Sequence, residues 1–257
     1  MAARRLLVIP TGTCRLAESR TRTGGSPDRE VAIPMPIFAI DTDDGWVLSD
    51  TGCDPRAADD PEGTWGRLAK AFRIDTTPAD FPLARLEENG IPLADVRHVV
   101  VSHLHMDHAG GLRFFPDAAI HVQRAELRWA LNPDRLGSAG FLRGDFDHPF
   151  LDYHLHEGDD EIVPGVHVAL TDGHTPGHQS LVVDLPSGRF VIAGDAAYLR
   201  EQIDRQIPPA VTTDEYAAVR SLARLRAFET RDQARILINH DPRLWQDLVL
   251  APGGSYT

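Results

Sequence analysis

Cysteine and lysine are nearly absent from this sequence. Of the 257 residues only two are cysteines, Cys14 and Cys53, and two cysteines do not make a disulfide framework. Both are expected to be reduced thiols that serve as small packing residues. Lys70 is the only lysine, and the formal net charge is −12 at pH 7. A chain this acidic is not expected to bind nucleic acid or an anionic membrane surface.

Long apolar runs are also absent, so nothing in the sequence predicts a membrane-spanning segment. The apolar run 6–9 is too short for the core of a signal peptide and is better interpreted as a first strand. We therefore expect a cytoplasmic protein. Hydrophobic residues make up 42% of the chain, which is enough for a sizeable core in one domain over residues 1–257.

Short β-branched runs bounded by turn residues alternate with helical patterns along the chain. The patterns predict strands at 5–9, 36–40, 45–49, 97–101, 120–123, 166–170, 189–192 and 234–238, and helices near 64–72, 82–89, 124–130 and 213–230. Residues 43–45 are expected to form a hairpin turn, and 21–36 a loop. Residues 131–156 are expected to form a long insert, interpreted either as a lid or pocket wall or as a satellite core beneath a loop.

The densest group of metal ligands lies directly after the strand expected at 97–101. Four side chains in the run 103–108 are imidazoles or a carboxylate, namely His103, His105, Asp107 and His108. A borderline divalent ion such as zinc prefers these ligands. A solvated polar turn rarely collects four of them in six residues. The pattern therefore predicts a metal site at a strand end, open to a cleft.

Three further ligands follow other expected strands. His178 comes after the strand at 166–170, Asp195 after 189–192, and His240 after 234–238. A structural zinc site needs about four ligands and is usually rich in cysteine. Seven ligands without a cysteine suit two metal ions that share one carboxylate and leave positions open for water, which is a catalytic arrangement.

The other histidines are given structural or surface roles. His174 is interpreted as a supporting neighbour of the expected ligand His178. The remaining histidines lie in strand-like runs or in a polar loop, and none is expected to bind metal: His98, His121, His148, His154, His156 and His167.

The order of the expected ligands resembles that of the metallo-β-lactamase superfamily. The segments 9–14, 102–111, 122–126, 174–181 and 195–198 are similar to those of the N-acyl-homoserine lactonases, which quench quorum signals. The resemblance implies an α+β fold, the four-layered αββα sandwich, with the site at one edge of two sheets. It also implies a small-molecule lactone as substrate, and it leaves a homodimer open.

The same resemblance implies a role for each ligand. His103, His105 and His178 would hold one metal ion, Asp107, His108 and His240 would hold the other, and Asp195 would bridge the two. Both ions are expected to be zinc, although cobalt, manganese and iron suit the same donors.

The implied reaction is the opening of a lactone ring by a hydroxide that bridges two metal ions. Tyr198 would donate a hydrogen bond to the carbonyl oxygen as negative charge develops there. Asp107 would have a second role, passing a proton to the leaving alkoxide.

Substrate-pocket residues are expected where this chain departs from the lactonase pattern. Met106 stands where an aromatic residue is common. The insert 131–156 contributes Phe146 and Phe150, and the segment 207–210 contributes Ile207 and Ala210. These five side chains are predicted to line the pocket for the acyl chain.

Three other functions fit parts of the pattern. A hydrolase of this fold could act on another lactone such as pyridoxolactone, or on a thioester, phosphotriester or β-lactam, although class B β-lactamases have cysteine where this chain has Asp195. A redox diiron protein is a second alternative, but the flavodiiron pattern has glutamate at the position of His105. A metal-binding regulator without catalysis is the third, and open coordination positions argue against it.

Overall fold

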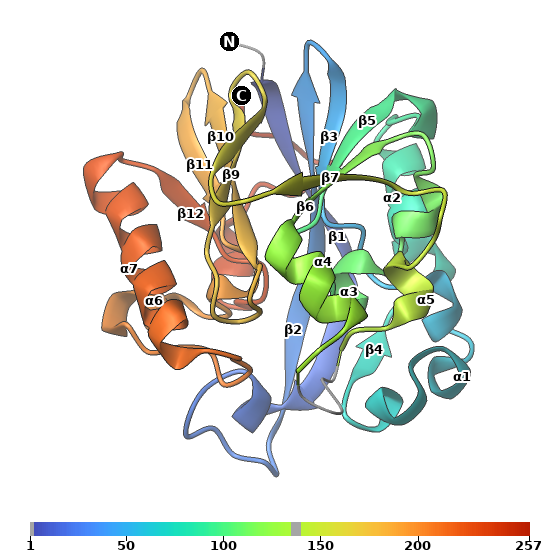
Figure 1. The fold of residues 1–257 in the computed structure, drawn as a ribbon, viewed down its shortest axis with the longest axis vertical. Helices are drawn as coiled ribbons and strands as arrows, with labels where there is room; N and C mark the ends of the chain where they lie inside the picture. Colours follow the sequence, from blue (N-terminus) through green and yellow to red (C-terminus); the bar gives the residue numbers. More distant parts are fainter. Residues whose placement is uncertain (1–2, 135–139) are drawn as a thin grey trace.

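The structure is a computed structural model that describes residues 3–134 and 140–257. Within these residues two β-sheets face each other and helices cover their outer faces (Figure 1). The order of the four layers is helix, sheet, sheet, helix, which confirms the αββα sandwich expected from the sequence. No helix in the described part of the chain is long and apolar enough to cross a membrane.

The larger sheet has seven strands within the described residues, in the order β4-β1-β2-β3-β5-β6-β7. β1, β2 and β3 are antiparallel neighbours, whereas β5, β6 and β7 run parallel to β3. Parallel pairing brings the carboxyl ends of these strands to one edge of the sheet. The strands are β1 (Ala3–Ala17), β2 (Glu30–Thr42), β3 (Gly45–Ser49), β4 (Arg73–Asp75), β5 (Val96–Val100), β6 (Ala119–Gln123) and β7 (Asp152–His156).

The smaller sheet has five strands among the described residues, in the order β12-β11-β10-β9-β8. Its strands are β8 (Asp160–Val163), β9 (Val166–Leu170), β10 (Gln179–Leu185), β11 (Gly188–Ile192) and β12 (Arg235–Leu237). The helices are α1 (Pro61–Trp65), α2 (Pro82–Glu88), α3 (Met106–Ala109), α4 (Arg124–Leu131), α5 (Arg143–Phe146), α6 (Arg200–Arg205) and α7 (Glu215–Arg231).

Successive side chains of a strand pack into different cores. In β1, Leu6 and Val8 point into the core between the two sheets, whereas Leu7 and Ile9 point into the core on the outer face of the larger sheet. Successive strand side chains face opposite sides, so one apolar strand serves both cores. A third core lies between the smaller sheet and α6 and α7, which cover its outer face in Figure 1.

Several local predictions are confirmed by the structure. A hairpin turn joins β2 and β3 at residues 43–45, and its Gly45 has a φ of 99°. Helix α2 ends shortly before Gly90, whose φ of 66° is a conformation that glycine adopts without strain. The long helix expected at 213–230 is α7. Cys14 and Cys53 are both buried and free, in agreement with their expected packing role.

Other boundaries differ from the expectation. The segment 21–36 was predicted to be a loop, but β2 already begins at Glu30 and pairs with β1 as far as Ala17. The β1–β2 pair is longer than expected because Leu16 and Ile33, near its far end, pack in a separate apolar cluster. The helix predicted near 64–72 is the short α1 followed by a 3₁₀ turn.

The insert 131–156 contains α5 and β7 in the part that the structure describes. β7 pairs with β6 along its whole length, so this part of the insert extends the larger sheet. Residues 152–156 alternate polar and apolar side chains, which is the period of a half-buried strand, but the run is only five residues long and lies in a polar insert.

Three histidines form a row across β5, β6 and β7. Nδ1 of His98 lies 3.0 Å from Nε2 of His121, and Nδ1 of His121 lies 3.0 Å from Nε2 of His156. Carboxylate oxygens of Asp44 and Asp160 accept hydrogen bonds at the two ends of the row. Burial, together with the neighbouring His98, lowers the pKa of His121 to about 3. These contacts lie within the sheet and agree with the structural role expected for the three histidines.

Candidate metal centre

The candidate centre lies where four strands end at the same edge of the sandwich. His103 and His105 follow β5, His174 follows β9, Asp195 follows β11, and His240 follows β12. Asp107 and His108 lie in the first turn of α3, which begins immediately after His105. The strands thus hold most of the ligand-bearing residues at their carboxyl ends, where loops can project side chains into a shared space.

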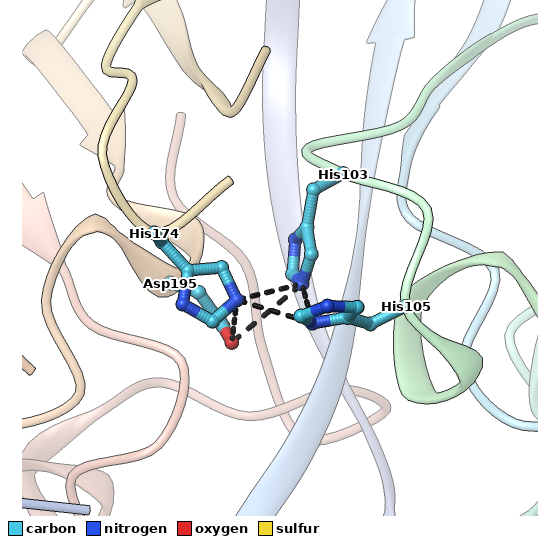
Figure 2. Close-up of side chains that lie close together, drawn as sticks. All are labelled: His103, His105, His174 and Asp195. Carbon is cyan, nitrogen blue, oxygen red and sulfur yellow. Dashed lines mark hydrogen bonds and ion pairs between the residues drawn. The ribbon is translucent and has the colours of Figure 1, made fainter. Parts of the chain in front are cut away.

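One group of ligand atoms consists of three imidazole nitrogens and one carboxylate oxygen (Figure 2). Nε2 of His103 lies 2.9 Å from Nδ1 of His105, and Nε2 of His174 lies within 3.2 Å of both. Oδ2 of Asp195 is 3.3 Å from the His174 nitrogen and 3.7 Å from that of His103. Ligand atoms this close surround a volume that suits one divalent ion.

The second group combines Asp107, His108 and His240. Nε2 of His108 lies 3.6 Å from Oδ2 of Asp107. The other carboxylate oxygen of Asp195, Oδ1, lies 3.3 Å from His108 Nε2 and 3.0 Å from His240 Nε2. Asp195 therefore directs one oxygen to each group.

Hydrogen bonds on the far side of the rings fix the tautomers. Nδ1 of His108 donates to Asp50 at 2.8 Å, and Nδ1 of His174 donates to the carbonyl of Val211 at 2.7 Å. Nδ1 of His240 donates to the carbonyl of Pro34 at 2.8 Å. Each of these rings has its proton on Nδ1, so the Nε2 lone pair points into the centre, as a metal ligand requires.

Burial controls the charge of these groups. Removal from water, reinforced by neighbouring imidazoles, lowers the pKa of His103 and of His105 well below the usual value. For Asp195, burial opposes ionisation, but nearby His108 and His240 outweigh it and hold the pKa well below the usual range. Burial alone would lower the pKa of His108 and of His240, but the charge of Asp195 outweighs it and raises both. A divalent cation would take the place of the protons on these two rings, since it binds neutral imidazoles beside an ionised carboxylate.

Two buried atoms of the centre lack a hydrogen-bond partner among the described residues. They are Nε2 of His108 and Oδ1 of Asp195, which face each other across the second group. When His108 is neutral its proton lies on Nδ1, so both atoms are acceptors, and two buried acceptors without a donor are costly. A cation between them would satisfy both, so the residues of the second group fit a divalent metal.

The position of His178 differs from the expectation. It was predicted to be a ligand with His174 as its supporting neighbour, but His174 occupies the first group and His178 lies outside both. Nε2 of His178 accepts a hydrogen bond from the main-chain N–H of Asp195, and Nδ1 contacts Thr171. His174 and His178 both lie in the loop that follows β9. The spacing of the motif does not show which of the two rings points into the centre.

A cavity leads to the centre. Its polar end is formed by His105, Asp107, Asp195, Tyr198 and His240. The cavity wall is largely apolar and consists of Cys14, Leu16, Arg20, Ile33, Phe72, Met106, Gly140 and Val211. Tyr198 is buried, and burial together with Asp195 and Asp107 raises the pKa of its hydroxyl well above the usual value. Its hydroxyl therefore stays protonated and available as a donor.

Only one of the five predicted pocket residues, Met106, lines this cavity. Phe146 is fully buried in the outer core of the larger sheet, and Phe150 is 49% exposed and stacks on His148. Ile207 and Ala210 are not among the lining residues, although the adjacent Val211 is.

The prediction missed the wall formed by β1, β2 and the segment around Phe72. The long β1–β2 pairing and the pairing of β4 with β1 bring these residues to the site, so the local sequence carries no signal for them.

Comparisons with known proteins agree with this geometry. A sequence profile of the Metallo-beta-lactamase superfamily matches residues 36–240. The chain is 34% identical over 262 residues to the N-acyl homoserine lactonase AttM of Azorhizobium caulinodans, with 97% of each protein covered. It is 33% identical over 244 residues to the N-acyl homoserine lactonase AiiA of Bacillus thuringiensis subsp. kurstaki, with 94% of each covered.

A solved structure extends the similarity to the whole fold. An N-acyl homoserine lactone hydrolase, with the product N-hexanoyl-L-homoserine bound at its catalytic metal center, superimposes with a TM-score of 0.89. The match is 29% identical in sequence and covers 98% of this chain and 99% of that chain. The chain therefore belongs to the metallo-beta-lactamase superfamily, and within it to the family that contains AttM and AiiA.

Proposed function

We propose that this protein is a metal-dependent hydrolase that opens the lactone ring of N-acyl-homoserine lactones. The observation that carries the proposal is the position of Asp195, whose two oxygens each face one ligand group beside Tyr198 at the end of an apolar cavity. Its relatives AttM and AiiA are N-acyl homoserine lactonases that align over nearly the whole chain.

The proposed ligands follow the two groups. His103, His105 and His174 would hold one ion, Asp107, His108 and His240 the other, and Asp195 both. Nitrogen and oxygen donors without sulfur suit zinc first, and also cobalt, manganese or iron. When bound, such ions supply an activated water and a Lewis acid for a carbonyl oxygen near neutral pH.

Two side chains of the protein would act directly on the lactone. The protonated hydroxyl of Tyr198 donates a hydrogen bond to the carbonyl oxygen, and this bond strengthens as the oxygen becomes negative. Asp107 is partly exposed at the cavity and would take up the proton that the attacking water releases and pass it to the alkoxide formed when the ring C–O bond breaks.

The apolar wall of the cavity suits an acyl chain. Leu16, Ile33, Phe72 and Val211 present hydrocarbon surface beside the polar end, so a substrate with a polar ring and an apolar tail would be oriented by both. Within the insert 131–156, Gly140 lines the cavity and the ring of Phe141 packs 4.5 Å from that of His105. This part of the insert is proposed as a pocket wall. A homodimer and a cytoplasmic location stay predictions.

Acid release measures the proposed reaction directly. Metal-loaded protein is mixed in weak buffer with a pH indicator and with N-acyl-homoserine lactones of short and long chain, beside simple γ-lactones and a chelated control. Rapid acidification that needs both the acyl chain and the metal is the expected result. Absence of acidification, with metal shown to be bound, would reject the substrate class. Pyridoxolactone, phosphotriesters and thioesters would then be tested.

A further inference from the structure

Glu126 is a buried carboxylate that the proposed reaction does not use. It lies in the first turn of α4, outside both ligand groups, and its side chain has no exposed surface. A carboxylate taken out of water is costly unless its oxygens are hydrogen-bonded. Burial raises the pKa of Glu126 to about 7 despite the N–H groups that it contacts. A residue this costly to bury needs a reason for its position.

The two oxygens of Glu126 contact two different ligand-bearing loops. Oε1 accepts a hydrogen bond of 2.9 Å from the main-chain N–H of Leu104, which lies between His103 and His105. Oε2 accepts a hydrogen bond of 3.1 Å from the main-chain N–H of Gly177, in the loop that carries His174. One side chain therefore connects the loop after β5 with the loop after β9.

Gly177 lies very close to the main chain of Glu126. A Cβ atom added to Gly177 would lie 2.2 Å from the main-chain nitrogen of Glu126 and 2.6 Å from its Cβ. Real side-chain carbons do not approach that closely, so the loop can touch α4 only because residue 177 is a glycine. The loop has little room to move relative to Glu126 while the hydrogen bond persists.

The ligands that these loops carry come from two sheets. His103 and His105 follow a strand of the larger sheet, and His174 follows a strand of the smaller one. Their nitrogens lie within 3.2 Å of one another, so a shift of about 1 Å between the loops would change the coordination geometry. The His174 ring presents a lone pair to the other two rings, because its proton lies on Nδ1, and it donates no hydrogen bond that would hold it to them without a metal.

We propose that Glu126 is a positioning residue that ties the loop of His103 and His105 to the loop of His174 and so sets the geometry of the first ligand group. This inference rests on the metal role given to that group under the proposed function. It assigns Glu126 no contact with the lactone and no part in proton transfer. Its effect is on metal affinity and on the geometry around the metal.

The test compares Glu126→Gln with the wild type and with Glu157→Gln. Glu157 is an exposed glutamate that directly follows the insert 131–156 and pairs with Arg124. Its variant therefore controls for the loss of one negative charge. A glutamine side chain can accept only one of the two N–H bonds and turns an N–H₂ group toward the other. Metal-free proteins are titrated with Co²⁺, and affinity, stoichiometry and the visible absorption spectrum are recorded beside the melting temperature of the metal-free form.

We expect Glu126→Gln to bind Co²⁺ about 10- to 100-fold more weakly and to change the absorption spectrum, while Glu157→Gln matches the wild type. A folded Glu126→Gln with wild-type affinity and spectrum would overturn the proposal. If that variant does not fold without metal, Glu126→Asp replaces it, because its shorter carboxylate cannot reach both loops, and the same two outcomes decide. Wild-type protein that binds cobalt but opens no lactone would reject the proposed substrate and leave this inference standing.

Discussion

The main-chain N–H of Asp195 donates a hydrogen bond of 2.9 Å to Nε2 of His178. Because Nε2 accepts this bond, the ring proton lies on Nδ1, which reaches the carbonyl of Thr171 at 3.1 Å. Neither nitrogen of His178 is left with a lone pair for a metal. The ring instead supports the residue that faces both ligand groups, and a Cβ on the adjacent Gly194 would lie 2.6 Å from it.

Substitution of the two histidines is expected to separate their roles. His174→Ala should bind one metal equivalent fewer per chain and lose most of its activity, because a ligand of the first group is removed. His178→Gln should retain its metal and lose thermal stability, since a buried hydrogen-bonded ring is replaced. Metal content after dialysis and thermal unfolding measure the two effects. If His178→Gln lost metal and His174→Ala kept it, His178 would be the ligand, as predicted from the sequence.

Asp195→Ala is expected to lose metal and activity together. Each ligand group loses an oxygen, and the imidazoles of His108 and His240 lose the carboxylate that faces them at 3.3 and 3.0 Å. Metal content and acid release are measured on the same preparation. Full activity in a variant that retains metal would show that neither group needs this carboxylate.

Tyr198→Phe is expected to keep its metal and to lose about 10- to 100-fold in kcat, the cost of one hydrogen bond made to a developing oxyanion. The ring packs between those of His174 and His240, at 5.8 and 5.3 Å between centroids, and phenylalanine retains that packing. Steady-state kinetics beside metal analysis make the measurement. An unchanged kcat would remove the hydroxyl from the mechanism.

Acid should destabilise the protein through His121. Its pKa is about 3 in the folded chain against 6.5 as the ordinary value, so between these values the unfolded state binds more protons. The stability that comes from burying the neutral ring is therefore complete above about pH 6.5 and falls as the pH drops toward 3. The slope that one such histidine adds is at most about 1.4 kcal/mol per pH unit.

Denaturant unfolding of the wild type and of His121→Gln between pH 7 and 4 measures this effect. The variant should show a shallower fall in unfolding free energy, whatever its absolute stability. His148→Gln is the matched control, because His148 is partly exposed and contacts Phe150 and the carbonyl of Gly144 rather than the row of histidines. Equal slopes for wild type and His121→Gln would show that this ring does not cause the acid sensitivity.

Phe72→Ala is expected to change the chain-length preference of the enzyme. The side chain forms part of the apolar cavity wall, and removal of its ring should lower kcat/KM for long acyl chains about tenfold relative to short ones. Phe150→Ala, at an exposed phenylalanine outside the cavity, is the matched control. An unchanged ratio of long-chain to short-chain kcat/KM in Phe72→Ala would place the acyl chain elsewhere.

Much of the fold and most of the ligand groups were predictable because they depend on local patterns. Short apolar runs predict buried strands whatever their partners. The run 103–108 places four ligands within six residues. Asp195 and His240 also follow directly from their position after apolar strands. The resemblance to a known family then supplied the order of the layers.

Tertiary structure alone decided which histidine of the pair 174 and 178 faces the centre, and which side chains form the cavity. Both histidines follow the same strand, and the choice depends on hydrogen bonds to Val211 and Asp195 from distant parts of the chain. The cavity wall joins β1, β2 and Phe72, which are far from the ligands in sequence. Local sequence determines which segments become strands and where polar groups stand, whereas the direction of each ring depends on packing between segments that meet only in the folded chain.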